Sequence, residues 1–199
     1  MLLASAIASL HDDCVRAWHE DGESERRAET DFAELVRRQH RANFELWHIE
    51  DEARRPHASD AELASVKRRI DATNQRRNDL AEQIDEMLLQ ELRATALPGA
   101  DAPLHSESPG LMIDRLSILS LKIYHTREEA ERSDAPAGHA ERNRARLALL
   151  EEQRSDLAAC LDTLWREALE GRRRFKVYRQ LKMYNDPELN PAVYGERRE

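Results

Sequence analysis

The segment SPGLMIDRLSILSLKIYH, residues 108–125, decides the fold that the sequence predicts. Serine followed by proline is typical of a helix start, because the Ser108 hydroxyl can accept a hydrogen bond from a free backbone N–H and Pro109 suits the first helical position. The residues that follow are apolar almost all the way round a helix. This pattern predicts a helix that is buried on nearly every side, at the centre of a bundle.

Glycine and proline divide the rest of the chain into long segments. All six glycines and seven prolines lie near Gly22, near Pro56, within 98–110, within 136–138, at Gly171 or in the last thirteen residues. Both residue types disrupt helix interiors, glycine through backbone entropy and proline through its missing N–H. The five long gaps carry apolar residues at spacings of three and four, without sustained alternation. The sequence therefore predicts an all-α bundle of about five long helices.

Local signals mark further helix ends and the extent of the bundle. In SDAE, residues 59–62, Ser59 can cap the free amides while Glu62 reaches back, which is the capping box of a helix start. Gly171 can end the helix predicted over 138–170. We therefore expect residues 1–171 to form the bundle, with residues 172–199 as an irregular basic tail that packs on it and is not a separate domain.

The composition favours a single domain in the cytoplasm. The chain has 199 residues, of which 35% are charged and 40% hydrophobic, and a net charge of -8. An acidic surface repels polyanions, so neither nucleic acid nor an anionic membrane is an expected partner. The two cysteines cannot form a disulfide framework, which fits a reducing compartment. No run approaches the roughly 20 apolar residues that span a bilayer.

Polar residues interrupt the apolar stripes of the second, third and fourth predicted helices. Because each apolar stripe must face the core, polar residues in line with it must face the same interior. We predict that these side chains converge on a common interior space, a usual place for ligands in helical bundles. The candidate site residues on these helices are Asn43, Trp47, Glu50, Asp51, Arg54, Asn74, Arg77, Asn78, Asp114, Arg115, Lys122 and His125.

Three interpretations of this polar cluster compete. The first is an internal ion-pair network that fixes the register of the helices, with acids such as Glu50 and Asp114 against cations such as Arg54 and Arg77. The second is a polar pocket in which Trp47 stacks on a ligand and amides orient it. The third is a solvated face, if the helical phase is misplaced. Each satisfies polar groups that would be costly to bury alone.

A metal-dependent hydrolase is an alternative from a different class. All-helical pyrophosphohydrolases bind Mg²⁺ through carboxylates on facing helices, and Glu50, Asp51 and Asp114 are the candidate ligands here. The match is poor, because Arg54 stands at the third acidic position of the first helix and only Glu82 and Asp85 remain for the second. The histidines show no two-histidine helical spacing. We therefore expect no metal site and no cofactor, except Mg²⁺ under this alternative.

The tail segment GRRRFKVYRQLK, residues 171–182, contains six basic residues and no acid. A solvated basic stretch that balances acidic helices is one interpretation. Phosphate capture is the other, because arginine binds phosphate oxygens bidentately and an aromatic ring can stack on a base or a sugar. The candidate ligand-binding residues of the tail are Lys176, Tyr178 and Lys182. A tail folded back across the bundle would close the pocket as a lid.

Four segments resemble a known family. NFELWHIEDEARR, IDATNQRRND, SESPGLMIDRLSILSLKIYH and FKVYRQLKMYNDPELNP together resemble the bacterial Domain of Unknown Function family 4254, over nearly the whole chain. The resemblance implies a helical bacterial protein without an established activity, associated with envelope-sugar glycosyltransferases. Family members tend to read NSETPG before the fourth helix, whereas this chain has HSESPG with His105 at the first position. A role for an asparagine there does not carry over.

Our hypothesis from the sequence is a cytoplasmic protein that binds a phosphorylated sugar, a nucleotide or a nucleotide sugar in the polar pocket. It would serve as an accessory to envelope-polysaccharide glycosyltransferases. A purely structural protein is the remaining alternative. For that class, the apolar residues Leu2, Leu3 and Ile7 of the first helix are a candidate homodimer seam or docking stripe.

Overall fold

The computed structural model describes residues 3–20, 30–97, 99, 101–181 and 188–191. Five long helices lie in these ranges: α1 (Ala4–Glu20), α2 (Asp31–Glu52), α3 (Asp60–Ala94), α4 (Pro109–Glu131) and α5 (His139–Leu169). The described residues form no strand, and their one β-bridge joins Leu104 to Arg174. The prediction of an all-α bundle of about five long helices is confirmed.

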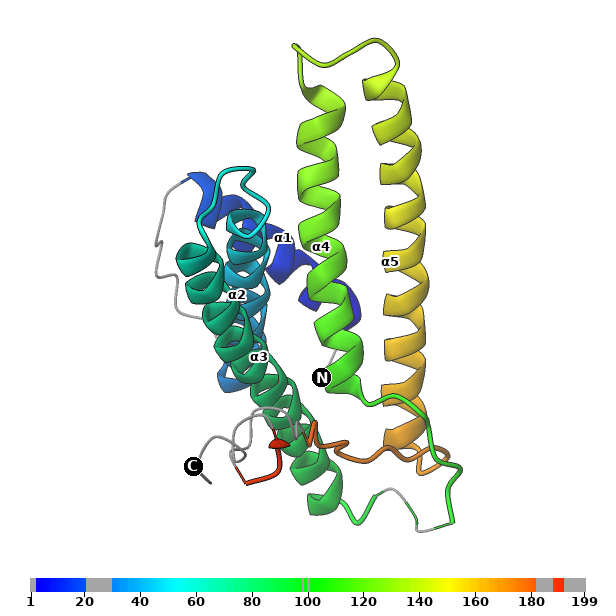
Figure 1. Ribbon diagram of the computed structural model, residues 1–199. Coiled ribbons are helices and arrows are strands. Elements are labelled where there is room, and N and C mark those ends of the chain that lie inside the picture. The colour runs from blue at the N-terminus through cyan, green and yellow to red at the C-terminus, as the bar shows by residue number, and fades with distance from the viewer. Residues whose placement is uncertain (1–2, 21–29, 98, 100, 182–187, 192–199) are drawn as a thin grey trace.

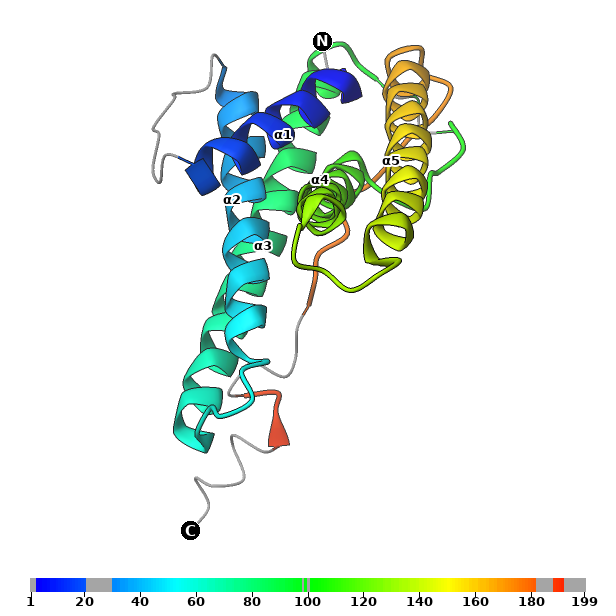
Figure 2. The same cartoon turned by 90° about the horizontal axis from the view of Figure 1, so that it is seen from above.

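The helices form two antiparallel pairs with α1 across them (Figures 1 and 2). One pair is α2 with α3, and the other is α4 with α5. α1 contacts α2, α4 and α5, and α4 contacts each of the other four helices. The central position that the sequence predicts for residues 108–125 is therefore confirmed.

The predicted helix ends are present. The Ser59 side chain accepts a hydrogen bond from the backbone N–H of Glu62 while the Glu62 side chain accepts from the Ser59 backbone, a complete capping box. Ser108 accepts from the backbone N–H of Leu111, and Pro109 follows at the first helical position. Gly171 ends α5 with a φ of 72°, a left-handed conformation that favours glycine.

The core forms around α4. Its residues Ile113, Leu116 and Leu121 are at most 1% exposed and pack against apolar residues of the other helices. A smaller cluster joins Val15 and Trp18 of α1 to α2 and α4, and partly buried Trp47 and Tyr124 cover it. Trp18 of this cluster lies against His40 of α2, with ring centroids 5.1 Å apart, so the apolar packing helps to fix where this polar side chain lies.

The structure does not expose the predicted N-terminal docking stripe of Leu2, Leu3 and Ile7 as one apolar surface. Ile7 is only 5% exposed and belongs to the main core, because the turn of α1 that carries it packs onto the bundle. Leu3 is 45% exposed, and Leu2 lies outside the described residues. Among the described residues, no helix combines the length and the apolarity that a bilayer crossing requires.

The first part of the tail, residues 172–181, lies against the bundle. Phe175 is 3% exposed and belongs to the main core. The backbone of Arg174 pairs with the connection before α4, donating to the Pro103 carbonyl at 3.0 Å and accepting from His105 N–H at 2.8 Å. Arg179 forms ion pairs with Glu82 at 3.3 Å and with Glu86 at 2.8 Å on α3. The tail thus joins the end of α5 to the side of α3.

Candidate functional site

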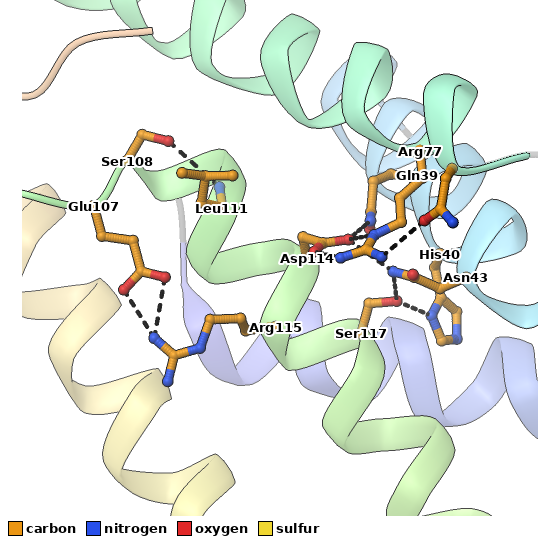
Figure 3. A network of polar contacts seen from close by, with 11 residues as sticks. Gln39, His40, Asn43, Arg77, Glu107, Ser108, Leu111, Asp114, Arg115 and Ser117 are labelled. Carbon is orange, nitrogen blue, oxygen red and sulfur yellow. Dashed lines mark hydrogen bonds and ion pairs between the residues drawn. The ribbon is translucent and has the colours of Figure 1, made fainter. Parts of the chain in front are cut away.

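A buried carboxylate on α4 gathers donors from two other helices (Figure 3). Asp114 is 6% exposed. It accepts hydrogen bonds from Gln39 Nε2 and, at 2.9 Å, from Asn43 Nδ2, both on α2. From α3, Arg77 donates through Nε to Oδ1 at 2.7 Å and through Nη2 to Oδ2 at 2.6 Å. The structure therefore brings together Asn43, Arg77 and Asp114, three of the candidate residues for which the sequence predicts a common interior space.

The network continues through a serine and a histidine toward α1. Asn43 Nδ2 also donates to Ser117 Oγ at 2.9 Å, and Ser117 Oγ lies 2.7 Å from His40 Nδ1. His40 Nε2 lies 3.1 Å from the His11 carbonyl oxygen, which can only accept. Nε2 must therefore carry the proton. Because burial lowers the pKa of His40 to about 3, the ring is neutral and its Nδ1 accepts from the Ser117 hydroxyl.

The ion pair between Arg77 and Asp114 holds this network together electrostatically. Hydrogen bonding to Asp114 raises the pKa of Arg77 above its ordinary value, so the guanidinium is charged. A buried carboxylate is tolerated only when its charge is compensated and its lone pairs are occupied. Four donated hydrogen bonds meet both requirements for Asp114. Gln39 Oε1 is buried without a hydrogen-bond partner among the described residues.

A cavity of about 300 Å³ lies beside the network. Leu46, Ile118 and Leu121 form its apolar wall. Its polar lining consists of residues that the sequence singled out: Asn43, Trp47, Glu50, Asp51, Arg54 and Arg77. An apolar cavity with a few convergent polar groups is the usual form of a small-molecule site.

The cations of the cavity already have anionic partners. Arg54 lies 3.2 Å from Glu50 and 3.9 Å from Asp51, and its side chain is 67% exposed. Such exposed pairs are weak and exchange readily. Arg77 is held more firmly, because two of its nitrogens bind Asp114 while Nη1 contacts Asn74 Oδ1 at 3.4 Å. The cavity therefore offers one movable guanidinium and one fixed guanidinium with a weakly used nitrogen.

Other candidate residues lie outside this cavity. Asn78 is half-buried on α3 and is not part of the cavity lining. Arg115 turns to the opposite side of α4, where it pairs with Glu107 at 2.8 Å (Figure 3). Arg115 and Lys122 line a separate cavity of about 750 Å³ between α4 and α5. His125 stacks on Trp47, with ring centroids 4.8 Å apart and planes 11° apart.

The predicted lid is not found in the described part of the tail. Lys176 lines a separate cavity of about 480 Å³ with α3, and Tyr178 is 36% exposed. Burial of Phe175 fixes the tail near Glu82 and Glu86, roughly 7–13 Å along α3 from Arg77 at 1.5 Å per residue. Lys182 lies outside the described residues.

Sequence reasoning missed the part of the network contributed by α1. His11 is completely buried, and its ring lies beside that of His40, with centroids 4.4 Å apart and planes tilted by 34°. Burial lowers the pKa of His11 well below its ordinary value, and the nearby His40 ring lowers it further. The one available signal was its position, four residues after Ile7 on the stripe that faces the core.

The fold and the site are those of an all-α protein with a buried polar network beside a small cavity between helices. Residues 33–177 match the family described as a protein of unknown function, DUF4254, and the chain belongs to that family. Comparison with curated proteins and with solved structures finds no match.

Proposed function

We propose that this protein binds a small phosphorylated molecule in the cavity lined by Trp47, Arg54 and Arg77. The observation that carries the proposal is the combination of a tryptophan, an apolar wall and two guanidinium groups around one space of about 300 Å³. Tryptophan suits a sugar ring or a base, and guanidinium groups suit phosphate oxygens. The cavity is at the lower end of the 300–1,000 Å³ typical of ligand sites, which favours a sugar phosphate over a nucleotide sugar.

The two arginines would have different roles. Arg77 is fixed by Asp114, so it can present Nη1 to an anion without losing its own partner. Arg54 is exposed, so a phosphate can replace the Glu50 and Asp51 carboxylates as its partner while its Nη1 keeps the hydrogen bond to the Glu50 carbonyl oxygen. The released carboxylates would then accept hydrogen bonds from ligand hydroxyls. Asn43 lines the cavity and also donates to Asp114, the carboxylate that fixes Arg77.

A structural role is the second candidate function. The hydrogen-bond network of Asn43, Arg77 and Asp114 is satisfied by protein groups alone. It needs no ligand, and it ties α2, α3 and α4 in one register. A structural role does not account for Trp47 and Arg54, because they line the cavity beside the network without being part of it.

The carboxylate arrangement does not favour the Mg²⁺-dependent hydrolase. Asp114 is occupied by three side chains, while Glu50 and Asp51 pair with Arg54. Within the described ranges, these three carboxylates do not bring their oxygens together as metal ligands. The second acidic pair serves other purposes: Glu82 pairs with Arg179, and Asp85 accepts from Ser108 and Gly110.

The proposed setting is the bacterial cytoplasm, in association with envelope-sugar glycosyltransferases. It rests on the family resemblance and on the ligand class, since such enzymes handle activated, phosphorylated sugars. For this reason nucleotide sugars are worth testing as ligands although the cavity favours smaller molecules.

The test is a thermal-shift panel of sugar phosphates, mononucleotides and nucleotide sugars, followed by calorimetric titration of each hit. A ligand that binds only the folded state raises the melting temperature. Arg54→Ala should weaken binding by about 10- to 100-fold, as expected for loss of a charged hydrogen bond. The matched control is Arg55→Ala, which removes the same charge from the next, exposed position.

Two results would overturn the proposal. One is that no ligand of the panel raises the melting temperature, which would favour the structural role. The other is a hit that binds the two arginine variants equally, because that ligand would not occupy this cavity.

A further inference from the structure

Three histidines from three different helices meet beside Trp47. His19 belongs to the last turn of α1, His48 to α2 and His125 to α4. One ring nitrogen from each lies within 4.8 Å of the other two. The rings approach edge to face, with interplanar angles of 64° to 86° and centroids 5.1 to 6.0 Å apart. Despite these angles, the three nitrogens lie close enough together to share one ion after a small movement of the rings.

Hydrogen bonds determine which nitrogen two of the rings present. His19 Nδ1 lies 2.7 Å from the Val15 carbonyl oxygen, and His125 Nδ1 lies 2.8 Å from Glu128 Oε2. The Val15 carbonyl oxygen can only accept a hydrogen bond, and the Glu128 carboxylate can only accept when it is ionised. Each Nδ1 therefore carries a proton. In the neutral ring, Nε2 then has a free lone pair. Both Nε2 atoms are buried and have no hydrogen-bond partner among the described residues.

An unpartnered buried nitrogen is costly unless a ligand occupies it. Histidines that bind metals usually donate their other N–H to a carboxylate or a backbone carbonyl, which fixes the tautomer and the ring orientation. Glu128 and the Val15 carbonyl supply these two kinds of partner. The supporting contacts of a metal site are thus already in place for His19 and His125.

The surroundings of the third ring also favour the neutral form that binds metal. Burial lowers the pKa of His48, and proximity to His19 and His125 lowers it further, while Asp51 opposes the shift. Stacking on aromatic side chains fixes the orientation of the His19 and His125 rings. His19 stacks on Tyr124 with centroids 4.4 Å apart, and His125 stacks on Trp47. The stacked faces leave the nitrogen-bearing edges free to bind an ion.

We propose that His19, His48 and His125 bind one transition-metal ion of the class that prefers imidazole, with Zn²⁺ as the leading member. Three histidines and one open position form a familiar zinc arrangement. Two nitrogens on a tetrahedral Zn²⁺ lie roughly 3.3 Å apart at bond lengths near 2.05 Å, so binding draws the three rings slightly together. This proposal departs from the expectation of no metal that the sequence suggested, and it does not depend on a ligand in the neighbouring cavity.

The experiment is a Zn²⁺ titration of the full chain after chelator treatment, with no organic ligand present. We expect one Zn²⁺ per chain, a raised melting temperature, and X-ray absorption at the zinc edge that shows three imidazole nitrogens. His48→Ala should weaken binding by about 100-fold or more, since even outer contacts of a metal site are worth 10- to 100-fold. His57→Ala, at an exposed position between α2 and α3, is the matched control.

A second pair of variants tests the supporting carboxylate. Glu128→Gln should weaken Zn²⁺ binding by about 10-fold through His125, whereas Glu131→Gln at an exposed position on the same helix should not. Circular dichroism of each variant checks that it is folded.

The proposal is overturned if the wild-type chain binds no stoichiometric Zn²⁺, or if the absorption spectrum shows no histidine ligands. It is equally overturned if folded His48→Ala binds Zn²⁺ as tightly as His57→Ala. Because these measurements contain no phosphorylated molecule, their outcome is separate from that of the ligand panel.

Discussion

Arg77 of α3 and Asp114 of α4 form a two-point ion pair across the helix interface, with nitrogen–oxygen distances of 2.7 and 2.6 Å. Asp114 is buried, and among the described residues Arg77 is the cation that pairs with it. The pair also places Arg77 at the edge of the cavity beside Trp47. Stability and the proposed binding site therefore depend on the same contact.

Removal of Arg77 should be far more costly than removal of its neighbour. Arg77→Ala leaves Asp114 buried without a cation, and we expect a loss of about 3–5 kcal/mol in the free energy of unfolding. Arg76→Ala breaks an ion pair with Glu45 whose members are both about a third or more exposed, and should cost below about 1 kcal/mol. Urea unfolding of both variants measures the difference. Equal losses would contradict the buried-pair account.

Gly110 should not tolerate even a methyl group. A Cβ at this position would lie 2.3 Å from the Ala81 carbonyl oxygen and 2.9 Å from Asp85 Cγ, so α3 and α4 would have to separate. Helix propensity alone would favour alanine by about 1 kcal/mol. We expect Gly110→Ala instead to destabilise by about 3 kcal/mol or more. Gly99→Ala, where the Cβ would meet nothing within 4 Å, is the control in thermal unfolding.

Ser108 should stabilise the start of α4 in two ways. Its hydroxyl caps the helix at the Leu111 N–H and donates to Asp85, a carboxyl whose pKa burial raises to about 6. Ser108→Ala should cost about 1–2 kcal/mol in urea unfolding. It should also raise the pKa of Asp85 further, because the hydrogen bond from Ser108 lowers it. An NMR titration of Asp85 reads the pKa, and exposed Ser106→Ala should change neither quantity.

Mild acid should destabilise the protein through its buried histidines. The pKa of His40 is about 3 in the folded chain against an ordinary value of 6.5, and that of His11 is also well below 6.5. Below pH 6.5 the unfolded chain therefore binds protons that the folded chain does not. The stability is complete above pH 6.5 and falls by up to about 1.4 kcal/mol per pH unit for each histidine as the pH drops.

Asp85 acts in the opposite direction. Its folded pKa of about 6 exceeds its ordinary value of 3.8, so its contribution is complete below 3.8 and is lost as the pH rises through 6. The two histidines should outweigh this single group between pH 6 and pH 4. Urea unfolding at pH 7, 6 and 5 measures the slope, and His40→Gln should reduce it. A stability that rises from pH 7 to pH 5 would contradict the assignment.

Much of the fold can be predicted from local sequence. Ser59 and Ser108 predict helix starts, and Gly171 predicts the end of α5, because caps and left-handed turns depend on a few adjacent residues. Periodicity also predicts that Asn43 and Asp114 face one interior, since the apolar stripe sets the rotation of each helix. It does not predict which donor reaches which acceptor, because that depends on rotamers and on the spacing between helices.

The sequence by itself determined the five helices, the central place of α4 and the inward direction of Asn43, Arg77 and Asp114. Only the tertiary structure decided that Arg115 turns away from Asp114, that Phe175 holds the tail against α3, and that His19, His48 and His125 meet. The physical reason is the distance along the chain over which each interaction acts. Helix starts, helix ends and stripes arise from contacts within about one or two turns, whereas meetings between side chains depend on how whole helices cross.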